Sequence, residues 1–349
     1  MFYVIVFITI LLFCLSLSDT SHWYKGQLHF VSIKDTKRLV FFSLVILYLI
    51  VLFRPQDMPD YQSYIRDFKY LDKYMEYNME PGDKLLIKTV HLFTDHYMFV
   101  FAAFAAIGVP MKVYAIRKMA PFVFLSLAVY ASGMMIAQDM VAMRSSLAAG
   151  FFLWAIYYKL KHNLWMFLIL AFVAVSFHYS AVLVFPVWFL NTKKDYRKIY
   201  GLLIPIAYAA VILGQGITML FDSINIPLFQ AIWYNYKYFE EEDAYNVFNI
   251  IILFKVCFFY LIYFKLDEIK EHYSPIVLLM KIYCISLFIT ILLYQSQAAA
   301  IRVGDFLRCV EILFVPALLF AYGGKYRVKL HFICLIYCLM SLIGYNGYF

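Results

Sequence analysis

The stretch VSFHYSAVLVF, Val175–Phe185, places a histidine, a tyrosine and a serine inside one of the longest apolar runs of the chain. Polar and titratable groups are costly at the depth of a lipid bilayer, so their position needs a reason. The whole chain of 349 residues is 64% hydrophobic and 15% charged, with a mean hydropathy of +0.76. Water-soluble globular domains do not have such a composition. The sequence therefore predicts a polytopic membrane protein.

The rest of the chain repeats this apolar pattern. Runs of about 15 to 23 apolar residues are separated by short charged or Gly/Pro-containing links, and a helix needs about 20 such residues to cross a hydrocarbon core of roughly 30 Å. Backbone at that depth must be helical, because no water satisfies its hydrogen bonds. We expect an all-α fold of about 12 transmembrane helices, forming a single membrane domain over residues 1–349. The expected spans are approximately residues 1–17, 39–53, 96–111, 120–137, 145–158, 163–176, 181–190, 199–221, 247–264, 275–294, 306–322 and 329–346.

The net charge of +8 is distributed unevenly along the chain. Lys and Arg collect in some links and most carboxylates in the links between them. By the positive-inside rule the basic links face the cytoplasm, which leaves residues 54–95 and 222–246 as two loops on the outer side. The basic links are residues 25–38, 112–118, 159–161, 193–198, 265–270 and 325–329.

This assignment offers an explanation for the polar residues in Val175–Phe185. The basic links 159–161 and 193–198 lie on either side of this stretch. Both can face the cytoplasm only if residues 163–190 enter the membrane and return to the same side. Arms of about 14 and 10 residues would span roughly 21 Å and 15 Å, which is too little for the core. His178 would then lie at the tip of a shallow hairpin, or at a broken helix joint, below the outer surface. A single tilted span of about 28 residues is the alternative, but it would invert every later link.

The two outer loops are large enough to have structure of their own. After Pro59, apolar residues recur at helical spacing, which predicts an amphipathic helix on the outer surface. Residues 85–97 form a second short amphipathic piece, which we expect to be surface-lying or re-entrant. The loop 222–246 is rich in aromatic residues and carboxylates, which suits sugar rings, although an interfacial aromatic belt has the same composition. The helical pattern after Pro59 uses Tyr61, Tyr64, Ile65, Phe68, Leu71 and Met75.

Few charged groups lie in or just beneath the apolar layer, where each costs roughly 2.5 to 3.5 kcal/mol at a helix centre. We expect those on the outer side to form one basic cavity fringed by carboxylates. A guanidinium suits an anionic lipid head group, because its fork gives bidentate hydrogen bonds to phosphate and it keeps its proton. The candidates are Asp60, Glu80, Asp83, Asp139, Arg144, His178, Arg302, Asp305 and Arg308.

Several of these residues also have a purely structural explanation. Arg302 and Arg308 can each form a pair within their own helix, with Asp305 or Glu311 at i,i+3. The only sequence-near carboxylate for Arg144 is five residues away, which is a poor spacing and favours a functional role.

His178 can be a hydrogen-bonded packing residue, Asp60 can cap the surface helix, and Glu80 can belong to a Glu-Pro-Gly turn. The six cysteines fall in apolar runs without a CxxC pair or a metal-ligand spacing, so we expect small buried packing residues and no metal site. They are Cys14, Cys257, Cys284, Cys309, Cys334 and Cys338.

Five short motifs occur in a recognisable order: DMPDYQSYIRDF (57–68), MEPGDKLL (79–86), MRSSLAAGFF (143–152), FHYSA (177–181) and RVGDFL (302–307). Together they resemble the EpsG-like family of Wzy-type bacterial O-antigen and exopolysaccharide polymerases. The chain departs from the family in having Ser145-Ser146 where a glutamine usually follows the arginine, and Asp83 where an apolar residue usually follows Glu-Pro-Gly. The matching positions are Asp60, Tyr64, Glu80, Gly82, Arg144, His178, Tyr179, Ser180 and Arg302.

The resemblance implies a GT-C-like glycosyltransferase, multi-pass in the bacterial inner membrane with its active site facing the outer side. Such an enzyme joins undecaprenyl-diphosphate-linked repeat units into O-antigen, capsule or exopolysaccharide. The implied partners are the lipid-linked donor and acceptor glycans, membrane lipid, and flippase and chain-length regulator proteins. No cofactor and no nucleic acid is expected.

The roles follow from the chemistry of such a transfer. Cationic donors bind the diphosphate leaving group and stabilise its developing charge. A base takes the proton from the acceptor hydroxyl, and one base opposite the leaving group implies inversion. The expected diphosphate ligands are Arg144, Arg302 and Arg308. The candidate bases are His178, Asp60 and Glu80. The expected sugar contacts are Tyr61, Tyr64, Tyr179 and Ser180.

A lipid-linked glycan flippase or transporter is the alternative function. It too would have about twelve spans, a basic cavity and aromatic residues. It would also need polar residues that reach both faces of the membrane, whereas the charged candidates cluster on the outer half.

Overall fold

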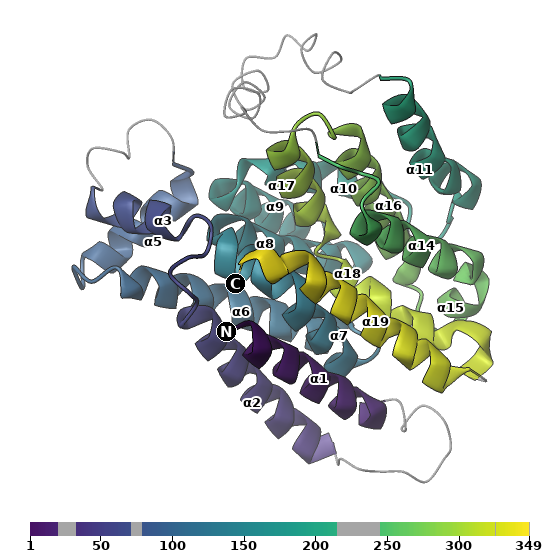
Figure 1. Ribbon diagram of the computed structural model, residues 1–349, viewed down its shortest axis with the longest axis horizontal. Coiled ribbons are helices and arrows are strands. Elements are labelled where there is room, and N and C mark those ends of the chain that lie inside the picture. Colours follow the sequence, from purple (N-terminus) through teal and green to yellow (C-terminus); the bar gives the residue numbers. More distant parts are fainter. Residues whose placement is uncertain (20–32, 71–78, 215–244, 325, 349) are drawn as a thin grey trace.

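The computed structural model describes residues 1–19, 33–70, 79–214, 245–324 and 326–348 (Figure 1). All regular elements in these ranges are helical, which confirms the all-α prediction. The first half contains α1 (Phe2–Asp19), α2 (Ile33–Leu52), α3 (Tyr61–Lys69), α5 (Pro81–His91), α6 (Met98–Met119), α7 (Val123–Val129), the π-helix η1 (Tyr130–Val141), α8 (Met143–Leu160), α9 (Leu164–Phe177), the 3-10 helix η2 (Tyr179–Leu183), α10 (Val184–Val187) and α11 (Arg197–Ile212). The second half contains α14 (Ile250–Phe264), α15 (Leu266–His272), α16 (Ile276–Leu292), α17 (Gln297–Arg308), α18 (Glu311–Phe314), the 3-10 helix η3 (Val315–Gly324), α19 (Arg327–Tyr345) and the 3-10 turn η4 (Asn346–Tyr348).

Three of the described helical segments are long and apolar enough to cross a membrane: α6, the continuous α7–η1 segment (Val123–Val141) and α19. Shorter apolar helices of 10–17 residues accompany them: Phe2–Leu17, Leu164–Phe177, Ile250–Phe264, Ile276–Leu292 and Glu311–Tyr322. By length and composition this helix set supports a membrane protein. The total of about 12 crossings, and the side that each link faces, stay predictions.

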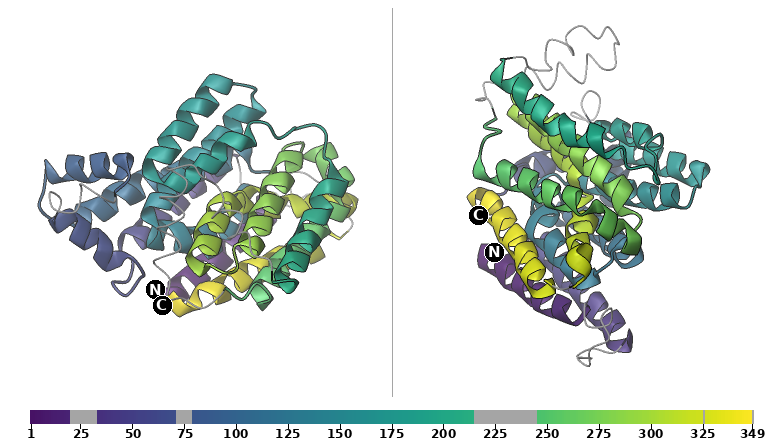
Figure 2. Two further views of the ribbon diagram at one scale, coloured as in Figure 1. Left: turned by 90° about the horizontal axis from the view of Figure 1, so that it is seen from above. Right: turned by 90° about the vertical axis from the view of Figure 1, so that its right-hand side faces the viewer.

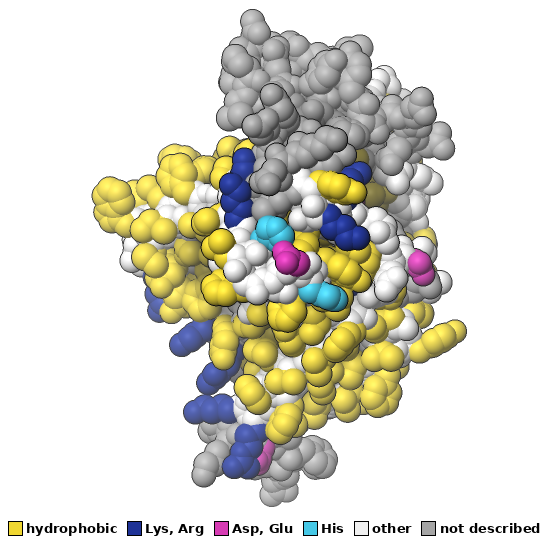
Figure 3. All heavy atoms as spheres, turned by 90° about the vertical axis from the view of Figure 1, so that its left-hand side faces the viewer, with side chains coloured by type: hydrophobic (Ala, Val, Ile, Leu, Met, Phe, Trp, Pro, Cys, Tyr) yellow, Lys and Arg dark blue, Asp and Glu magenta, His cyan; other side chains and the backbone are white. Residues whose placement is uncertain are grey.

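The surface agrees with this assignment. Figure 3 shows a face on which apolar side chains predominate; His and acidic side chains meet near its centre with Lys and Arg side chains beside them, and further Lys and Arg side chains line its lower left edge. Large apolar side chains such as Phe42, Phe172 and Phe264 are exposed. Contiguous exposed apolar surface is rare on soluble monomers and is expected where lipid covers the protein.

Helix α8 connects the parts of the fold that matter for function. It packs against α6, α9 and η1 and also contacts α17 and η2. Its start follows η1 through one non-helical residue, Ala142, with φ −94° and ψ 68°. Elsewhere α1 contacts α19, so the N and C marks lie close together (Figures 1 and 2).

The segment 163–190 is a broken hairpin with His178 at its tip. Helix α9 ends at Phe177, His178 is extended with φ −158° and ψ 119°, and η2 and α10 follow. The second arm runs back along the first, because the rings of Phe167 and Trp188 are 5.1 Å apart and those of Phe172 and Phe185 are 5.0 Å apart. The alternative of one continuous tilted span is therefore wrong.

The amphipathic helix predicted after Pro59 is present as α3, with Tyr61, Tyr64 and Phe68 on its buried face, and its place on the outer surface stays a prediction. The expected turn at Glu80-Pro81-Gly82 is instead the start of α5, because proline at the first helical position favours helix initiation. Leu71, Met75 and nearly all of the expected outer loop 222–246 lie outside the described residues.

Other boundaries differ from the prediction. The expected span 96–111 continues as α6 to Met119, so Lys112 is buried inside a helix and does not belong to a basic link. The expected span 306–322 is divided into the end of α17, α18 and the 3-10 helix η3. All six cysteines are free, but only four are buried, since Cys14 and Cys257 are exposed on apolar helices.

Candidate functional site

Glu80 brings together residues from three parts of the chain. Its Oε2 atom accepts a hydrogen bond from Arg144 Nη1 at 2.8 Å, and its Oε1 atom lies 3.5 Å from His178 Nδ1. Glu80 precedes α5, Arg144 is the second residue of α8, and His178 is the tip of the broken hairpin. The structure therefore assembles an acid, a cation and an imidazole that lie far apart in the sequence.

The Glu-Pro-Gly motif explains how Glu80 reaches this place. Glu80 is extended, with φ −61° and ψ 143°, and Pro81 starts α5 directly after it. Gly82 then packs against the last turn of α9: a Cβ atom on Gly82 would lie 2.8 Å from Ser176 Oγ and 2.9 Å from its carbonyl oxygen. Only glycine permits this approach without displacement. The contact fixes α5 beside His178.

Arg144 is held from the other side by α3. Its backbone N–H, one of the free donors at the start of α8, donates to the Tyr64 hydroxyl at 3.4 Å. The Tyr64 ring packs against Phe101 and Phe104 of α6, and burial raises the pKa of Tyr64 to about 12, so its hydroxyl stays protonated. The Arg144 side chain is still 35% exposed. The side chain is therefore partly accessible to an anion.

The two carboxyl groups at the start of α5, those of Glu80 and Asp83, have pKa values that are shifted in opposite directions. Burial alone would raise the pKa of Glu80, but the hydrogen bond with His178 and the charge of Arg144 outweigh it and hold the pKa below its usual range. Burial, together with the charge of the neighbouring Glu80 and against the effect of Arg144, raises the pKa of Asp83 to about 9. Asp83 is fully buried, and among the described residues no hydrogen-bond donor meets either of its oxygens. At neutral pH the site thus combines an ionised and a protonated carboxyl group.

The other site residues predicted in the first loop and the hairpin are Asp60, Tyr61, Tyr179 and Ser180, and they differ in their exposure. Asp60 precedes α3 in a left-handed conformation with φ 63°, is exposed and does not cap the helix with its side chain. Tyr61 packs on Phe101 with ring centroids 4.8 Å apart, so the protein covers its ring. Tyr179 is 40% exposed next to His178, whereas Ser180 is buried.

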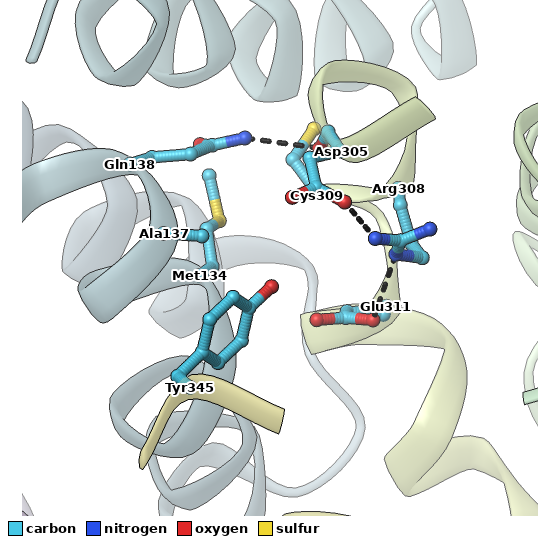
Figure 4. Close-up of a pocket in the computed structure, with 8 residues that line it drawn as sticks. All are labelled: Met134, Ala137, Gln138, Asp305, Arg308, Cys309, Glu311 and Tyr345. Carbon is cyan, nitrogen blue, oxygen red and sulfur yellow. Dashed lines mark hydrogen bonds and ion pairs between the residues drawn. The ribbon is translucent and has the colours of Figure 1, made fainter. Parts of the chain in front are cut away.

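The two predicted arginines of α17 have different surroundings. Arg302 is exposed and lies one helical turn before Phe306, whose ring centroid is 6.4 Å from that of His178. Arg308 is buried and forms ion pairs with Asp305 and, at 3.8 Å, with Glu311 (Figure 4). The pairing of Arg308 within its own helix, one of the alternatives from spacing, is therefore observed.

Arg308 belongs to a small pocket away from Glu80. Met134, Ala137 and Gln138 of η1 form one wall, and Arg308, Cys309, Glu311 and Tyr345 complete it together with Asp305 (Figure 4). Glu311 also accepts a hydrogen bond from the Tyr337 hydroxyl at 2.7 Å and lies 3.7 Å from Lys255 Nζ. Glu80, Arg144, His178 and Tyr64 form one cluster, and Arg308 forms part of another.

A third polar cluster contains Asp139, which we expected in the outer cavity, and its partner Lys112, which we expected in a basic link. Lys112 Nζ lies 2.7 Å from Asp139 Oδ1 and 2.6 Å from Ser146 Oγ, and all three residues are buried. The available signal was a lysine in an apolar run that the spacing assigned to a helix end. Within the described ranges no group of three His, Cys, Asp or Glu side chains is arranged to hold a metal ion.

These features define an all-helical membrane-type protein with an acid, cation and imidazole cluster where the N-terminus of one helix meets the tip of a broken hairpin. The EpsG family model matches residues 37–348, and the chain belongs to that family. The match confirms the resemblance that the motifs indicated. It does so at the level of the family, which is associated with exopolysaccharide synthesis. No curated protein and no solved structure matches the chain, so the GT-C-like fold stays a prediction.

Proposed function

We propose that this EpsG-family protein is a polysaccharide polymerase that transfers a growing glycan between undecaprenyl-diphosphate carriers on the outer side of the inner membrane. The observation that carries the proposal is the bridge formed by Glu80 between Arg144 and His178. It supplies a cation for a diphosphate and an oriented imidazole for an acceptor hydroxyl, which are the groups that such a transfer needs.

In this mechanism Arg144 binds the diphosphate of the donor. Its part-exposed guanidinium offers in-plane N–H groups for bidentate hydrogen bonds to phosphate oxygens, while Nη1 also donates to Glu80. As the bond between the anomeric carbon and the diphosphate oxygen breaks, its electron pair remains on that oxygen. Arg144 stabilises the added negative charge, and the exposed Arg302 is proposed to help.

His178 is proposed as the base. With the proton on Nδ1, the imidazole donates toward Glu80 Oε1 and keeps a lone pair on Nε2, which is buried and has no hydrogen-bond partner among the described residues. The acceptor hydroxyl oxygen forms the new bond to the anomeric carbon, and its proton passes to Nε2. Attack opposite the leaving group inverts the anomeric configuration. Tyr179, exposed beside His178, is proposed to contact the sugar.

The test is Arg144→Ala in a strain that lacks the chromosomal gene, with surface glycan separated on a gel. We expect single repeat units at the surface and no long polymer, with the variant protein present in the membrane at parental amount. The matched control is Arg117→Ala, which removes an exposed arginine in the last turn of α6. This variant should make polymer of parental length. Long polymer in the Arg144→Ala strain contradicts the proposal. Absence of any repeat unit at the surface of the deletion strain would favour the flippase.

A further inference from the structure

Consecutive residues at the end of the π-helix η1 bind different parts of the protein. Gln138 Nε2 donates to the carbonyl oxygen of Asp305 at 3.0 Å (Figure 4), and the carbonyl oxygen of Met140 accepts from Arg54 Nη1 at 2.9 Å. Asp139, between them, pairs with Lys112 of α6. The end of η1 is therefore tied to α17, to the start of the first loop and to α6. A π-helix of 12 residues is itself unusual, and such segments are frequent at functional sites.

The carboxylate of Asp139 has several partners. Oδ1 accepts from Lys112 Nζ at 2.7 Å and from Ser146 Oγ at 2.6 Å, and Oδ2 accepts from the Tyr130 hydroxyl at 2.9 Å. Lys112 also donates to Ser146 Oγ at 2.6 Å. The side chains of the ion pair are 0% and 1% exposed. Each charge is thus compensated inside the protein.

This network encloses the joint at which Arg144 begins a new helix. Asp139 lies in η1 before the joint, Ala142 is the non-helical residue, and Ser146 lies in the first turn of α8 after it. Lys112 and Asp139 both bind Ser146, so they connect η1 with the first turn of α8, which contains Arg144. Gly108 of α6 permits the close packing, since a Cβ atom there would lie 3.0 Å from Ser146 Oγ and 3.1 Å from Asp139 Oδ1.

We infer that Lys112 and Asp139 are positioning residues for the transfer: by holding the η1–α8 joint from inside the membrane domain, they set the place of the Arg144 guanidinium. This inference rests on the proposed function of Arg144. Neither residue is expected to touch the substrate, because both are buried behind the joint.

A purely structural role makes a different prediction. Buried ion pairs can often be replaced by apolar residues of similar volume without loss of stability, whereas removing one partner leaves a buried charge and is strongly destabilising. The double variant Lys112→Met with Asp139→Leu removes both charges together. A structural pair predicts a folded and active double variant, and a positioning pair predicts a folded variant in which Arg144 is displaced.

The experiment measures binding of undecaprenyl diphosphate alone to the purified full chain. The double variant is made in the parental and in the Arg144→Ala background, which gives a double-mutant cycle. We expect the double variant to weaken binding about tenfold in the parental background and less than about twofold when Arg144 is already removed. Ser146→Ala, which keeps both charges, is the second variant and should show the same dependence on Arg144 with a smaller effect. Tyr273→Phe, which removes a buried hydrogen bond to the Met119 carbonyl, is the control and should show no dependence.

The outcomes separate the inference from the proposed function. Equal weakening in both backgrounds, or no weakening for the double variant and Ser146→Ala, overturns the positioning role while Arg144 keeps its own. If Arg144→Ala alone binds undecaprenyl diphosphate as well as the parent, the proposed function of Arg144 fails and the positioning role fails with it.

Discussion

Glu80 and Asp83 lie one helical turn apart at the start of α5, and the protein shifts their titration in opposite directions. Arg144 and His178 keep the pKa of Glu80 low despite its burial, whereas burial raises the pKa of Asp83 to about 9. The ionised group is the one that contacts both a cation and an imidazole. The neighbouring protonated group has a carboxyl proton that it can offer to Glu80.

The first prediction concerns Asp83 and pH. Between its ordinary pKa of 3.8 and its raised pKa of about 9, the folded protein keeps a proton that the unfolded chain has released. The free energy of unfolding therefore falls as the pH rises through this window, by up to about 1.4 kcal/mol per pH unit from this group. In the Asp83→Asn variant the side chain is neutral at every pH, so this pH-dependent loss of stability is absent. Its melting temperature should exceed that of the parent by a margin that widens between about pH 5 and about pH 8. A constant difference across this range contradicts the assignment.

The second prediction concerns Glu80→Gln. The amide preserves the shape of the side chain but neither neutralises Arg144 nor stabilises a protonated His178. We expect polymer output per membrane-inserted protein to fall by about a hundredfold or more. Quantification of surface glycan against protein amount measures this. Glu268→Gln, which removes a carboxylate that lies 2.7 Å from Lys265 outside the site, is the control and should keep parental output. Parental output from Glu80→Gln would exclude Glu80 from the mechanism.

The third prediction concerns Gly82→Ala. The added Cβ atom would meet both the side chain and the backbone of Ser176, so α5 must move away from the hairpin tip. Such overpacking costs about 1–3 kcal/mol, and the movement separates Glu80 from His178. Thermal unfolding and polymer output should both decrease. Gly347→Ala serves as the control, because nothing lies within 4 Å of a Cβ atom there. A Gly82→Ala variant with unchanged stability and output would show that this contact does not position Glu80.

The fourth prediction concerns Arg308, which pairs with Asp305 and Glu311. Arg308→Leu leaves the part-buried Asp305 without its cation and the buried Glu311 with Lys255 alone, which should cost up to about 3–5 kcal/mol and lower the yield of folded protein. Adding Asp305→Leu removes one of these charges and should restore much of the yield. Size-exclusion chromatography of the solubilised protein measures both.

The restored double variant then decides the function of Arg308. Long polymer made by it would show that Arg308 is structural. Absence of polymer despite full folding would support the predicted contact with the diphosphate.

Local pattern was sufficient to predict the helices, the surface helix α3 and the broken hairpin at His178. Charge decided the hairpin, because the basic links on both sides of residues 163–190 are cytoplasmic only if that segment enters the membrane and returns. The partner of Arg144 was not accessible in this way. Its carboxylate comes from a residue 64 positions earlier, and only the packing of α5 against α9 brings it within 2.8 Å.

Charge patterning failed at Lys112 for a related reason. A lysine near the end of an apolar run resembles a residue that reaches the cytoplasmic surface, and nothing near it in sequence indicates Asp139 as its partner. The π-helix η1 and the 3-10 helix η3 have the same apolar composition as an α-helix, so their hydrogen-bond patterns had no sequence signal. Both depend on tertiary contacts.

The shortness of the hairpin has a consequence for the surrounding lipid. Helix α9 has 14 residues, so it rises only about 21 Å, against a hydrocarbon thickness of roughly 30 Å. Acyl chains beside such an element must compress or tilt to avoid exposing a mismatched edge. We expect the bilayer next to His178 to be thinner than elsewhere, which under the proposed function shortens the distance over which a polyprenyl carrier dehydrates its charged head before it reaches the protein.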